Sequence, residues 1–406
     1  MDLLLYDDEV ARGWRPFALT RPIGELMFGA YTLRARAARA TGGEAVGHIT
    51  SSVLAGFDEP GAPPVVEADL GAGDRNRLFL SSRVVAGAPL PALPHETPAL
   101  LQVEGQWAGL WVPSGTPVPQ GLLDAVLQGV EPSESSTVVE LPGLVLDTPW
   151  DLMSRSPEWT RRDAADFTAS DLPPGVHRLG DGHVHIGEGA LVEPSVVIDT
   201  RSGPVVLDRD VHVHAFTRIA GPAYVGPGSI LLGGSFGDIS FGPMCRIRGE
   251  VKTTIVLGYS NKAHDGFLGH AVLGRWVNLG AMTTNSNLKN NYGPVRLDVA
   301  GKTIDTGMIK VGSFLGDHVK TGIGTLLNTG TVIEAASNVF GGAMPPKYVP
   351  PFSWGVGSEL TTHDIDRFLA ATEVVMSRRD QPFPDAMRQL FRRAFESSAP
   401  LREPAP

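Results

Sequence analysis

The segment "NKAHDGFLGH" at 261–270 contains residue types that acid–base and phosphate chemistry use. His264 follows Lys262 by two residues, among glycines and aliphatic residues that need no polar neighbours. A neutral imidazole can take a proton from an amine or a hydroxyl near neutral pH, and an ammonium group can bind a phosphate. The segment therefore indicates a general base beside a phosphate contact. A histidine in a glycine-rich turn is also common as a surface residue, so that alternative stays open.

Further cations and amides lie on either side of this segment. Arg246 and Arg248 are two residues apart, which places both on one face of a strand, and Lys252 follows shortly after. Downstream come Asn278, Thr283, Asn285 and Asn287. If these groups converge on one groove, its cations would suit a phosphate or diphosphate. The two arginines could equally be solvated outward residues.

Two His-Val-His triplets offer a different chemistry. His183 and His185 form one pair, and His212 and His214 form the other. Alternation along a strand puts each pair on one face, as a metal site requires. The sequence shows no carboxylate or cysteine at ligand-like spacing beside them, so we interpret them as outward histidines. A metalloenzyme of the carbonic-anhydrase type, with histidines converging at a trimer interface, is a further hypothesis, and it is weaker than the two given at the end of this subsection.

A sequence repeat of about six residues must position these side chains. From about 183 to 342 an aliphatic residue followed by a small or acidic one recurs, as in "VHIGEG", "AYVGPG", "VNLGAM" and "TVIEAA". This is the hexapeptide pattern of a left-handed parallel β-helix, in which the aliphatic residue fills the coil interior. A β-sandwich would show turns every 8–12 residues without a fixed register. The Asn- and Thr-rich stretch 283–309 interrupts the repeat and is predicted to be a projecting loop.

The segments before and after the repeat have other sequence patterns. Residues 1–172 mix strands, at 2–6 and 81–87, with helices, at 24–42, 120–130 and 157–167, which indicates an α/β domain of Rossmann-like type. The turn-rich segment 171–182 marks a boundary before a β-helix domain at 183–345. Residues 346–406 form a tail with helices expected at 361–379 and 384–398, the first capped by Thr361 and Asp364. We expect these helices to pack on the open end of the β-helix or on a neighbouring subunit.

Composition narrows the class of protein. A net charge of −10 gives no overall attraction to nucleic acid or to an anionic membrane. The single cysteine, Cys245, excludes an intrachain disulfide and fits a reducing compartment. The N-terminus lacks the basic residues of a signal peptide, and no apolar run approaches the ~20 residues of a membrane span. A cytoplasmic protein without a membrane span is expected.

The motifs "GPMCRIRG", "EVK" and "KAHDGFLGHAVLGRWVNLGAMTTNSN" resemble the acetyltransferase domain of the bifunctional N-acetylglucosamine-1-phosphate uridyltransferase/glucosamine-1-phosphate acetyltransferase family. That resemblance implies a left-handed β-helix, a homotrimer and acetyl-CoA bound between subunits. It puts His264 on the catalytic base. It also assigns the sugar-phosphate contacts to Arg248, Lys252 and Lys262.

The same alignment implies the remaining contacts of the acyltransferase site. Asn278 falls on a sugar-contacting asparagine, Ala281 falls on a residue lining the acetyl-CoA site, and Thr283 and Asn287 are assigned to that site as well. Phe267 replaces the family's tyrosine, and Met282 replaces a glycine. These departures leave the acceptor sugar and the acyl group open. His270 and Arg275 are interpreted as surface residues.

The N-terminal half resembles sugar nucleotidyltransferases more distantly. "WRPFALTRPIGEL" is similar to the segment that follows their glycine-rich nucleotide loop, but "LLLYDDEVARGWR" lacks the glycines of that loop. The resemblance implies that Arg15 and Arg21 hold phosphates and that Asp7 or Asp8 holds Mg²⁺. A fold retained for structure or binding alone remains the alternative for this domain.

Together these features predict an enzyme that transfers an acetyl or other acyl group from its CoA ester to an amino-sugar phosphate or nucleotide sugar. Transfer of a nucleotidyl group to a sugar 1-phosphate is a second predicted activity, in the N-terminal domain. The alternative hypothesis is a non-catalytic, sugar-nucleotide-binding or regulatory β-helix trimer. Calorimetry with acyl-CoA and sugar nucleotides separates the two, because a binding module would not require affinity for CoA.

Overall fold

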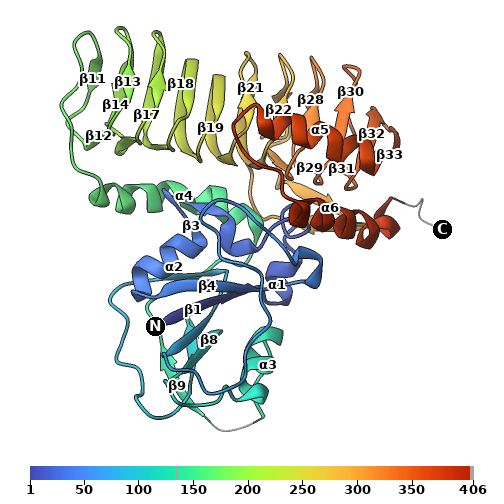
Figure 1. Cartoon of the computed structure of the whole chain (residues 1–406). Coiled ribbons are helices and arrows are strands. Elements are labelled where there is room, and N and C mark those ends of the chain that lie inside the picture. The colour runs from blue at the N-terminus through green and yellow to red at the C-terminus, as the bar shows by residue number, and fades with distance from the viewer. Residues whose placement is uncertain (134–135, 403–406) are drawn as a thin grey trace.

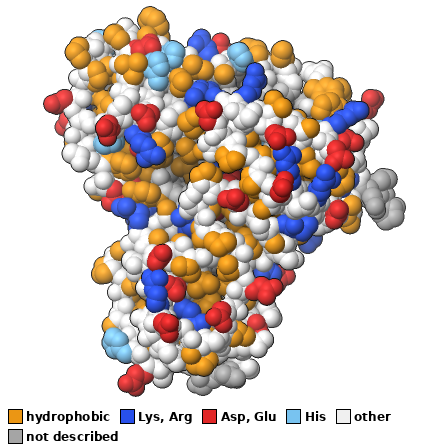
Figure 2. Space-filling view, in the orientation of Figure 1, with side chains coloured by type: hydrophobic (Ala, Val, Ile, Leu, Met, Phe, Trp, Pro, Cys, Tyr) orange, Lys and Arg blue, Asp and Glu red, His pale blue; other side chains and the backbone are white. Residues whose placement is uncertain are grey.

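The chain folds into an α/β domain and a β-helix that lie against each other, with two C-terminal helices along the side of the β-helix (Figure 1). The computed structural model describes residues 1–133 and 136–402. Acidic and basic side chains are interspersed over the face seen in Figure 2. Within the described residues, no helix is long and apolar enough to cross a membrane.

A six-stranded sheet forms the centre of the N-terminal domain. Its order is β4 (Glu44–Ile49), β1 (Asp2–Tyr6), β5 (Arg77–Ser81), β8 (Gln106–Val112), β7 (Ala99–Val103) and β9 (Thr137–Glu140). Strand β1 runs parallel to β4 and β5, whereas β8 runs antiparallel to β5 and β7. Leu3 and Leu5 enter one hydrophobic core and Leu4 and Tyr6 another, since alternate residues of a strand point to opposite faces. The sheet is therefore covered on both sides, as an α/β domain requires.

The helices of this domain agree with the sequence pattern in part. The structure has α1 (Glu9–Arg12), α2 (Leu33–Thr41), α3 (Gln120–Gln128) and α4 (Pro149–Asp163). The helix predicted over 24–42 was half wrong, because its first half is a 3₁₀ turn, Ile23–Glu25, followed by the hairpin of β2 (Met27–Phe28) and β3 (Tyr31–Thr32). Gly29 has a φ of +67° at the hairpin turn, which interrupts a helix. Helix α4 begins at Pro149, with a capping box from Thr148 and Asp151.

The remaining short elements complete the domain. They are β6 (Val84–Ala86), paired with β10 (Gly143–Val145), and the 3₁₀ turns η2 (Ser52–Leu54) and η3 (Ala164–Asp166).

The β-helix has three flat faces, and each coil contributes one short strand to each face. Face 1 consists of β13 (Leu191–Val192), β16 (His212–Val213), the starts of β18 (Ile230–Phe241) and β19 (Arg246–Gly258), then β20 (Asn261–Lys262), β22 (Asn278–Leu279), β27 (Lys320–Thr321), β30 (Asn338–Phe340) and β32 (Ser353–Val356). Face 2 consists of β11 (His177–Leu179), β14 (Val197–Asp199), the start of β17 (Thr217–Val225), the middles of β18 and β19, the start of β21 (Phe267–Arg275), β23 (Thr284–Asn285) and β28 (Leu326–Leu327). Face 3 consists of β12 (Val184–Ile186), β15 (Val205–Leu207), the later parts of β17, β18, β19 and β21, then β26 (Ser313–Leu315), β29 (Thr331–Ile333) and β31 (Tyr348–Val349).

Parallel pairing between successive coils holds these faces together, and inward side chains from all three faces, most of them aliphatic, fill the interior. Val213, Leu231 and Ile247 occupy one register position in consecutive coils and are all buried. Each fully buried side chain of this kind contributes roughly 1.5–3 kcal/mol. The predicted architecture, an α/β domain followed by a left-handed hexapeptide β-helix and a helical tail, is confirmed.

Face 3 of the β-helix packs on the N-terminal domain. Helix α4 lies along this face, as Figure 1 shows, and Trp159 belongs to the same hydrophobic core as Tyr224 and Ile255. Phe17 of the N-terminal domain joins this core. The two parts are thus fixed by a shared apolar interior.

The interruption at 283–309 is a hairpin on the solenoid, as the sequence predicted. After β23, the chain forms the antiparallel pair β24 (Arg296–Val299) and β25 (Lys302–Asp305) and returns at β26. Val295 and Leu297 are buried in the core that face 3 shares with the N-terminal domain. The insertion therefore strengthens the contact between the two parts.

The tail contains β33 (Glu359–Thr362), α5 (Ile365–Ser377), α6 (Asp385–Ser397) and the 3₁₀ turn η4 (Ala399–Leu401). The predicted helices are confirmed, but the predicted cap was wrong in one residue. Asp364 alone caps α5, by accepting a hydrogen bond from Arg367 N, while Thr361 pairs with Trp354 in an antiparallel strand that ends the solenoid. Helix α6 does not cover the open end. It packs against Leu54 and Phe57 of the N-terminal domain.

Candidate functional site

The outward side chains of face 1 form a ladder that contains Asn278 of the predicted site. Hydrogen-bonded register aligns one residue from each coil, in the order Leu191, His212, Ile230, Arg246, Asn261, Asn278, Lys320, Asn338 and Trp354. The middle of this ladder is polar. Because coils stack about 4.8 Å apart, residues far apart in sequence become neighbours there.

A basic pocket lies over this polar middle, between face 1 and the end of helix α5. It has a volume of about 420 Å³ and is lined by Tyr259, Asn261, Trp276, Val277, Asn278, Lys320, Val375, Arg378 and Arg379. Three cations and no carboxylate are among these residues. Burial lowers the pKa of Lys320, and burial together with Arg379 lowers the pKa of Arg246 next to the pocket. Cations gathered without counter-charges favour binding of an anion.

One wall of the pocket is aromatic. The rings of Tyr259 and Trp276 stack with centroids 4.5 Å apart and an interplanar angle of 23°. Both residues have positive φ at the turn that enters face 1 in consecutive coils. Arg379 Nη2 donates to Asn261 Oδ1 over 2.7 Å, which ties the helix end to the wall. A flat apolar ring or chain could lie on this wall while its phosphates meet the cations.

Asn278 is the predicted site residue that lies in this pocket. Its side chain is exposed, and its Oδ1 accepts a 3.4 Å hydrogen bond from Asn261 Nδ2. The pocket residues Lys320, Arg378 and Arg379 were missed by the sequence analysis. The adjacent arginines at the end of a predicted helix were the available signal, but the sequence could not place that helix over face 1.

His264 lies at the edge where the chain leaves face 1, three residues beyond Asn261. Its side chain is exposed. At ~3.3 Å per residue, it is within roughly 10 Å of the pocket wall. Its neighbour Asp265 forms an ion pair with Arg248, with Oδ1 3.0 Å from Nε. Nη1 of Arg248 donates a hydrogen bond to Leu232 O. Arg248 is therefore near His264 but bound within the protein.

Lys262 is placed differently from the expectation of a phosphate contact. It occupies the inward register position between Ile247 and Leu279, and it is buried. Its ammonium group donates to Arg248 O over 2.9 Å and to His264 O over 2.8 Å. Burial lowers its pKa to about 8; Asp265 acts against this shift and Arg248 adds to it. Lys262 thus fixes the backbone of His264 from inside the coil.

Lys252 is not brought to the same place. It lies at the far end of the face 2 part of β19, four residues beyond Arg248. Four residues of extended strand span roughly 13 Å. It is exposed in a shallow groove of about 240 Å³ that Asp238 and Arg218 also line. The predicted phosphate set of Arg248, Lys252 and Lys262 is therefore spread over two edges and the interior.

The residues assigned to acetyl-CoA are likewise divided. Ala281 is half-buried on the edge beside Met282. Thr283 points inward and lies 2.8 Å from Thr321 Oγ1. Asn287 Nδ2 donates to His270 Nδ1 over 2.8 Å, and burial, with Lys310 and Lys252, lowers the pKa of His270 to about 4. Ala281 alone of the three lies on the edge that carries His264.

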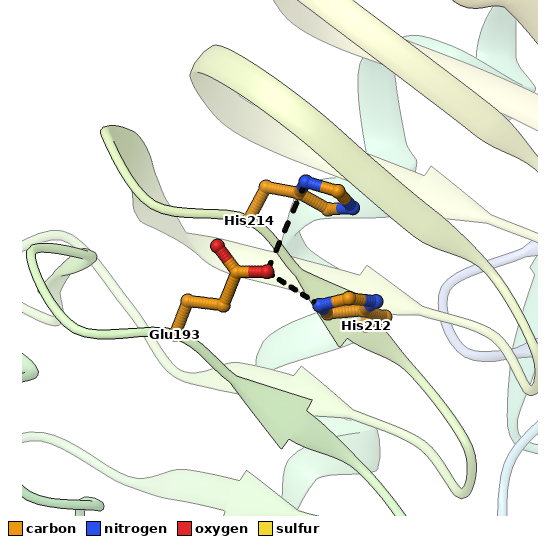
Figure 3. A group of neighbouring side chains, drawn as sticks. All are labelled: Glu193, His212 and His214. Atoms are coloured by element: carbon orange, nitrogen blue, oxygen red, sulfur yellow. Dashed lines mark hydrogen bonds and ion pairs between the residues drawn. The ribbon is translucent and has the colours of Figure 1, made fainter.

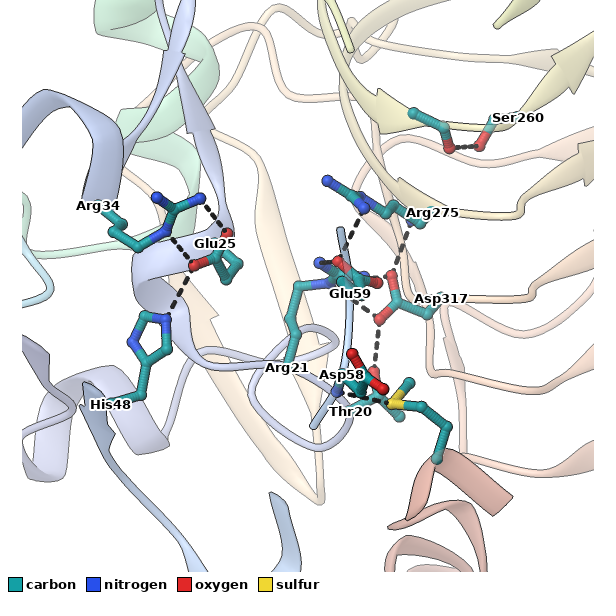
Figure 4. Close-up of polar contacts among 12 residues, drawn as sticks. Thr20, Arg21, Glu25, Arg34, His48, Asp58, Glu59, Ser260, Arg275 and Asp317 are labelled. Carbon is teal, nitrogen blue, oxygen red and sulfur yellow. Dashed lines mark hydrogen bonds and ion pairs between the residues drawn. The ribbon is translucent and has the colours of Figure 1, made fainter. Parts of the chain in front are cut away.

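The interpretation of Arg275 as a surface residue was wrong. Arg275 is buried, and its guanidinium group forms a 2.9 Å ion pair with Glu59. Its backbone N donates to Asp317 Oδ1 over 2.7 Å. Arg275 belongs to a network between the two domains, which Figure 4 shows.

Arg21 is the centre of that network. Its Nε lies 2.9 Å from Asp317 Oδ2, and its Nη2 lies 2.8 Å from Glu59 Oε1. Thr20 Oγ1 donates to the same Asp317 carboxylate over 2.8 Å. Arg15 makes a second bridge, with Nη1 3.2 Å from both oxygens of the buried Glu334. Both predicted phosphate ligands therefore join the N-terminal domain to the β-helix.

Asp7 and Asp8 do not fit a Mg²⁺ site in this arrangement. Asp8 caps α1 and is bound by Arg83, with Nη2 2.9 Å from Oδ2. Asp7 is buried, accepts a 2.6 Å hydrogen bond from Thr50 Oγ1, and has a pKa raised by burial. Among the described residues, neither belongs to a cluster of three metal-ligating side chains. An open cleft of about 590 Å³ does adjoin Asp8, Glu9 and Arg83.

The histidine triplets differ from each other in three dimensions. His212 and His214 face outward on face 1, and Glu193 from the preceding coil lies beside them, with Oε1 2.8 Å from His212 Nε2. The sequence analysis found no such carboxylate, because the partner comes from the coil below.

Comparisons with known proteins match parts of the chain. The family model described as sugar nucleotidyl transferase matches residues 3–171. The bifunctional sugar-1-phosphate nucleotidylyltransferase/acetyltransferase of Sulfurisphaera tokodaii is 36% identical over 95 residues, which are 23% of this chain and 24% of that protein. The bifunctional protein GlmU of Methanococcus vannielii is 26% identical over 224 residues, which are 55% of this chain and 48% of that protein. The chain thus spans less than half the length of either relative.

Among solved structures, the Arabidopsis UDP-N-acetylglucosamine acyltransferase covers 52% of this chain and 80% of its own, at 12% identity. Its TM-score is 0.26, a likeness too weak to carry an argument.

Proposed function

We propose that this chain is a divergent GlmU-like protein, and that its β-helix transfers an acyl group from acyl-CoA to the amine of an amino-sugar phosphate or nucleotide sugar. The observation that carries this proposal is the basic pocket on face 1, which is lined by Asn278 and by Asn261, three residues before His264. A ligand with phosphates at one end and a reacting group at the other would extend along this face.

The reaction needs one base and one stabilised oxyanion. The imidazole of His264 takes a proton from the attacking amine, whose nitrogen forms a bond to the thioester carbon. The carbon–sulfur bond breaks, and the leaving thiolate takes a proton from the imidazolium group. A backbone N–H of the neighbouring coil would stabilise the tetrahedral oxyanion. Lys262 acts as a positioning residue, since it binds the carbonyl group of His264.

Phosphate binding is assigned to the pocket cations Lys320, Arg378 and Arg379. They line one cavity, whereas the aligned set of Arg248, Lys252 and Lys262 does not. The aromatic wall of Tyr259 and Trp276 suits a nucleoside or the adenine of CoA.

A homotrimer is proposed on the edge that carries His264. Three exposed apolar side chains follow face 1 strands on this edge: Phe216, Met282 and Ile323, which are 83%, 57% and 75% exposed. Exposed apolar residues aligned on one edge favour a protein–protein contact. Acyl-CoA would then bind between subunits, beside Ala281. Size-exclusion chromatography with light scattering should give a trimer for the wild type and a smaller species for the double variant M282D/I323D.

Nucleotidyl transfer is proposed as a second activity, in the cleft beside Asp8 and Arg83. Its support is the family match of residues 3–171. The measurement is pyrophosphate release from nucleoside triphosphates and sugar 1-phosphates with Mg²⁺.

The decisive experiment compares wild type with His264→Gln in an assay of CoA thiol release from acetyl-CoA and amino-sugar 1-phosphates. Loss of a general base should lower kcat by about 10²–10⁴-fold. The exposed His177 on β11 provides the matched control, and H177Q should keep full activity. Unchanged turnover in H264Q would remove His264 as the base, and calorimetry showing sugar-nucleotide binding without CoA binding would favour a binding module.

A further inference from the structure

Two histidines and one glutamate form a compact cluster on face 1, near the N-terminal end of the β-helix. Figure 3 shows Glu193 pointing toward His212 and His214 from the preceding coil. Each side chain offers one ligand atom, and these three atoms lie within 4.8 Å of one another. We propose that these three side chains bind a divalent cation of the Zn²⁺ class. This proposal does not rest on the proposed acyl transfer.

The distances suit such an ion. Glu193 Oε1 lies 2.8 Å from His212 Nε2 and 3.9 Å from His214 Nδ1. Zinc binds imidazole nitrogen and carboxylate oxygen at about 2.0–2.2 Å, so tetrahedral ligands lie roughly 3.4 Å apart. The two distances bracket that value. Small rotations of the imidazoles would bring all three atoms to one ion.

The backbone holds the ligands in place. Val192 and Val213 are paired, inward and buried, so the residues that flank them have fixed directions. His212 and His214 lie on either side of Val213 and therefore share the outward face. Their rings stack with centroids 4.3 Å apart. Glu193 Oε2 accepts a 2.8 Å hydrogen bond from Ala215 N, which turns Oε1 toward the imidazoles.

The charge of the cluster is also appropriate. A metal ion bound here would have two imidazole nitrogens and one carboxylate oxygen as ligands, which together carry a formal charge of −1. In the part of the chain that the structure describes, Glu193 forms ion pairs with these histidines and with no Lys or Arg. The three side chains are 29–39% exposed, so water can occupy the remaining coordination position. Three protein ligands and an open position are the pattern of reactive rather than purely structural zinc sites.

The other histidine triplet provides an internal comparison. His183 and His185 have the same spacing, but His185 Nδ1 lies 2.7 Å from Thr168 O. Among the described residues, only Glu193, His212 and His214 bring three such ligands together. Glu193 from the preceding coil supplies a carboxylate to His212 and His214, whereas β12, which carries the other pair, is the first strand of face 3.

The test uses untagged, full-length protein that has been treated with a chelator. Calorimetric titration with Zn²⁺ alone, and absorption spectroscopy with Co²⁺ alone, should give one ion per chain and a low-coordinate Co²⁺ spectrum. E193Q should weaken binding at least tenfold, and H212N/H214N should abolish it. H183N/H185N is the matched control and should bind as the wild type does.

The proposal is overturned if the wild type takes up no more Zn²⁺ than H212N/H214N, or if H183N/H185N loses as much binding as that variant. Circular dichroism of the metal-free proteins checks that each variant is folded. E193Q keeps the size of the side chain at a surface position, so it gives an answer even where the double variant fails to fold.

Discussion

Arg21 in the N-terminal domain and Asp317 in the β-helix form a buried ion pair, with Nε 2.9 Å from Oδ2. Glu59 joins them from a third segment and also binds Arg275. Burial alone would raise the pKa of Glu59, but the two arginines hold it below its ordinary value. The segment that resembles the phosphate-contacting motif of nucleotidyltransferases is therefore committed to joining the two domains.

Replacing Arg21 with Met should destabilise the protein by about 3–5 kcal/mol, because two buried carboxylates would lose a partner. Denaturant unfolding measures the change, and interdomain separation would appear as an additional transition at low denaturant. The matched control is R39M, which removes an exposed ion pair with Asp166 that is worth at most ~1 kcal/mol. Equal effects of the two variants would contradict a structural role for the Arg21 network.

Glu25 should make the protein sensitive to acid. It lies 2.8 Å from His48 Nε2 and forms an ion pair with Arg34. Burial opposes ionisation, but these partners lower its pKa to about 2. A carboxyl group with a depressed folded-state pKa stabilises the fold above its unfolded pKa of about 4.5, and this contribution is lost as the pH falls toward 2.

The difference in unfolding free energy between wild type and E25Q should therefore be constant above about pH 5 and shrink below pH 4.5. Denaturant titrations from pH 7 to pH 3 measure it. E158Q removes the exposed partner of Arg162 and should show little dependence on pH. A difference between wild type and E25Q that stays flat down to pH 3 would argue against the depressed pKa.

Lys262 should have the opposite type of pH dependence. Its pKa falls from 10.5 to about 8 on folding, so the unfolded chain binds more protons between those two values. The wild type should gain stability relative to K262M as the pH rises from 8 to 10.5, and the difference should be flat below pH 8. In an acyl-transfer assay, K262M should lower kcat by a larger factor than it changes KM, because the carbonyl group of His264 loses its hydrogen bond from Lys262. A parallel loss in K302M, an exposed lysine on β25, would show that the effect is not specific.

Arg379 should contribute to the affinity for the phosphorylated ligand. Removing one charge-assisted hydrogen bond costs about 1.5–3 kcal/mol, which is roughly a 10- to 150-fold increase in Kd. Calorimetry of R379Q with CoA and with sugar nucleotides measures this, and wild-type affinity should fall as salt is added. R392Q, on the exposed side of α6, provides the control. Unaltered affinity in R379Q would place the phosphate site elsewhere.

The sequence by itself determined the β-helix. Each face of a coil needs an inward aliphatic residue, and this requirement produces the repeat of about six residues that is visible in the sequence. It also determined the two tail helices, since these depend on local pattern. The N-terminal sheet was only partly predicted. Its central strands are short, and their pairing partners lie far apart in the chain.

Only the tertiary structure decided what the charged residues do. Arg15 and Arg21 have the local pattern of phosphate ligands, yet buried carboxylates from the β-helix bind them. Lys262 has the spacing of a surface contact but points inward, because its register position lies between Ile247 and Leu279. Glu193 joins His212 and His214 through coil stacking, and Arg379 reaches Asn261 through the packing of a distant helix. The physical reason is the same in each case: the energy of a charge depends on the groups that surround it in space, and a linear pattern does not specify those groups.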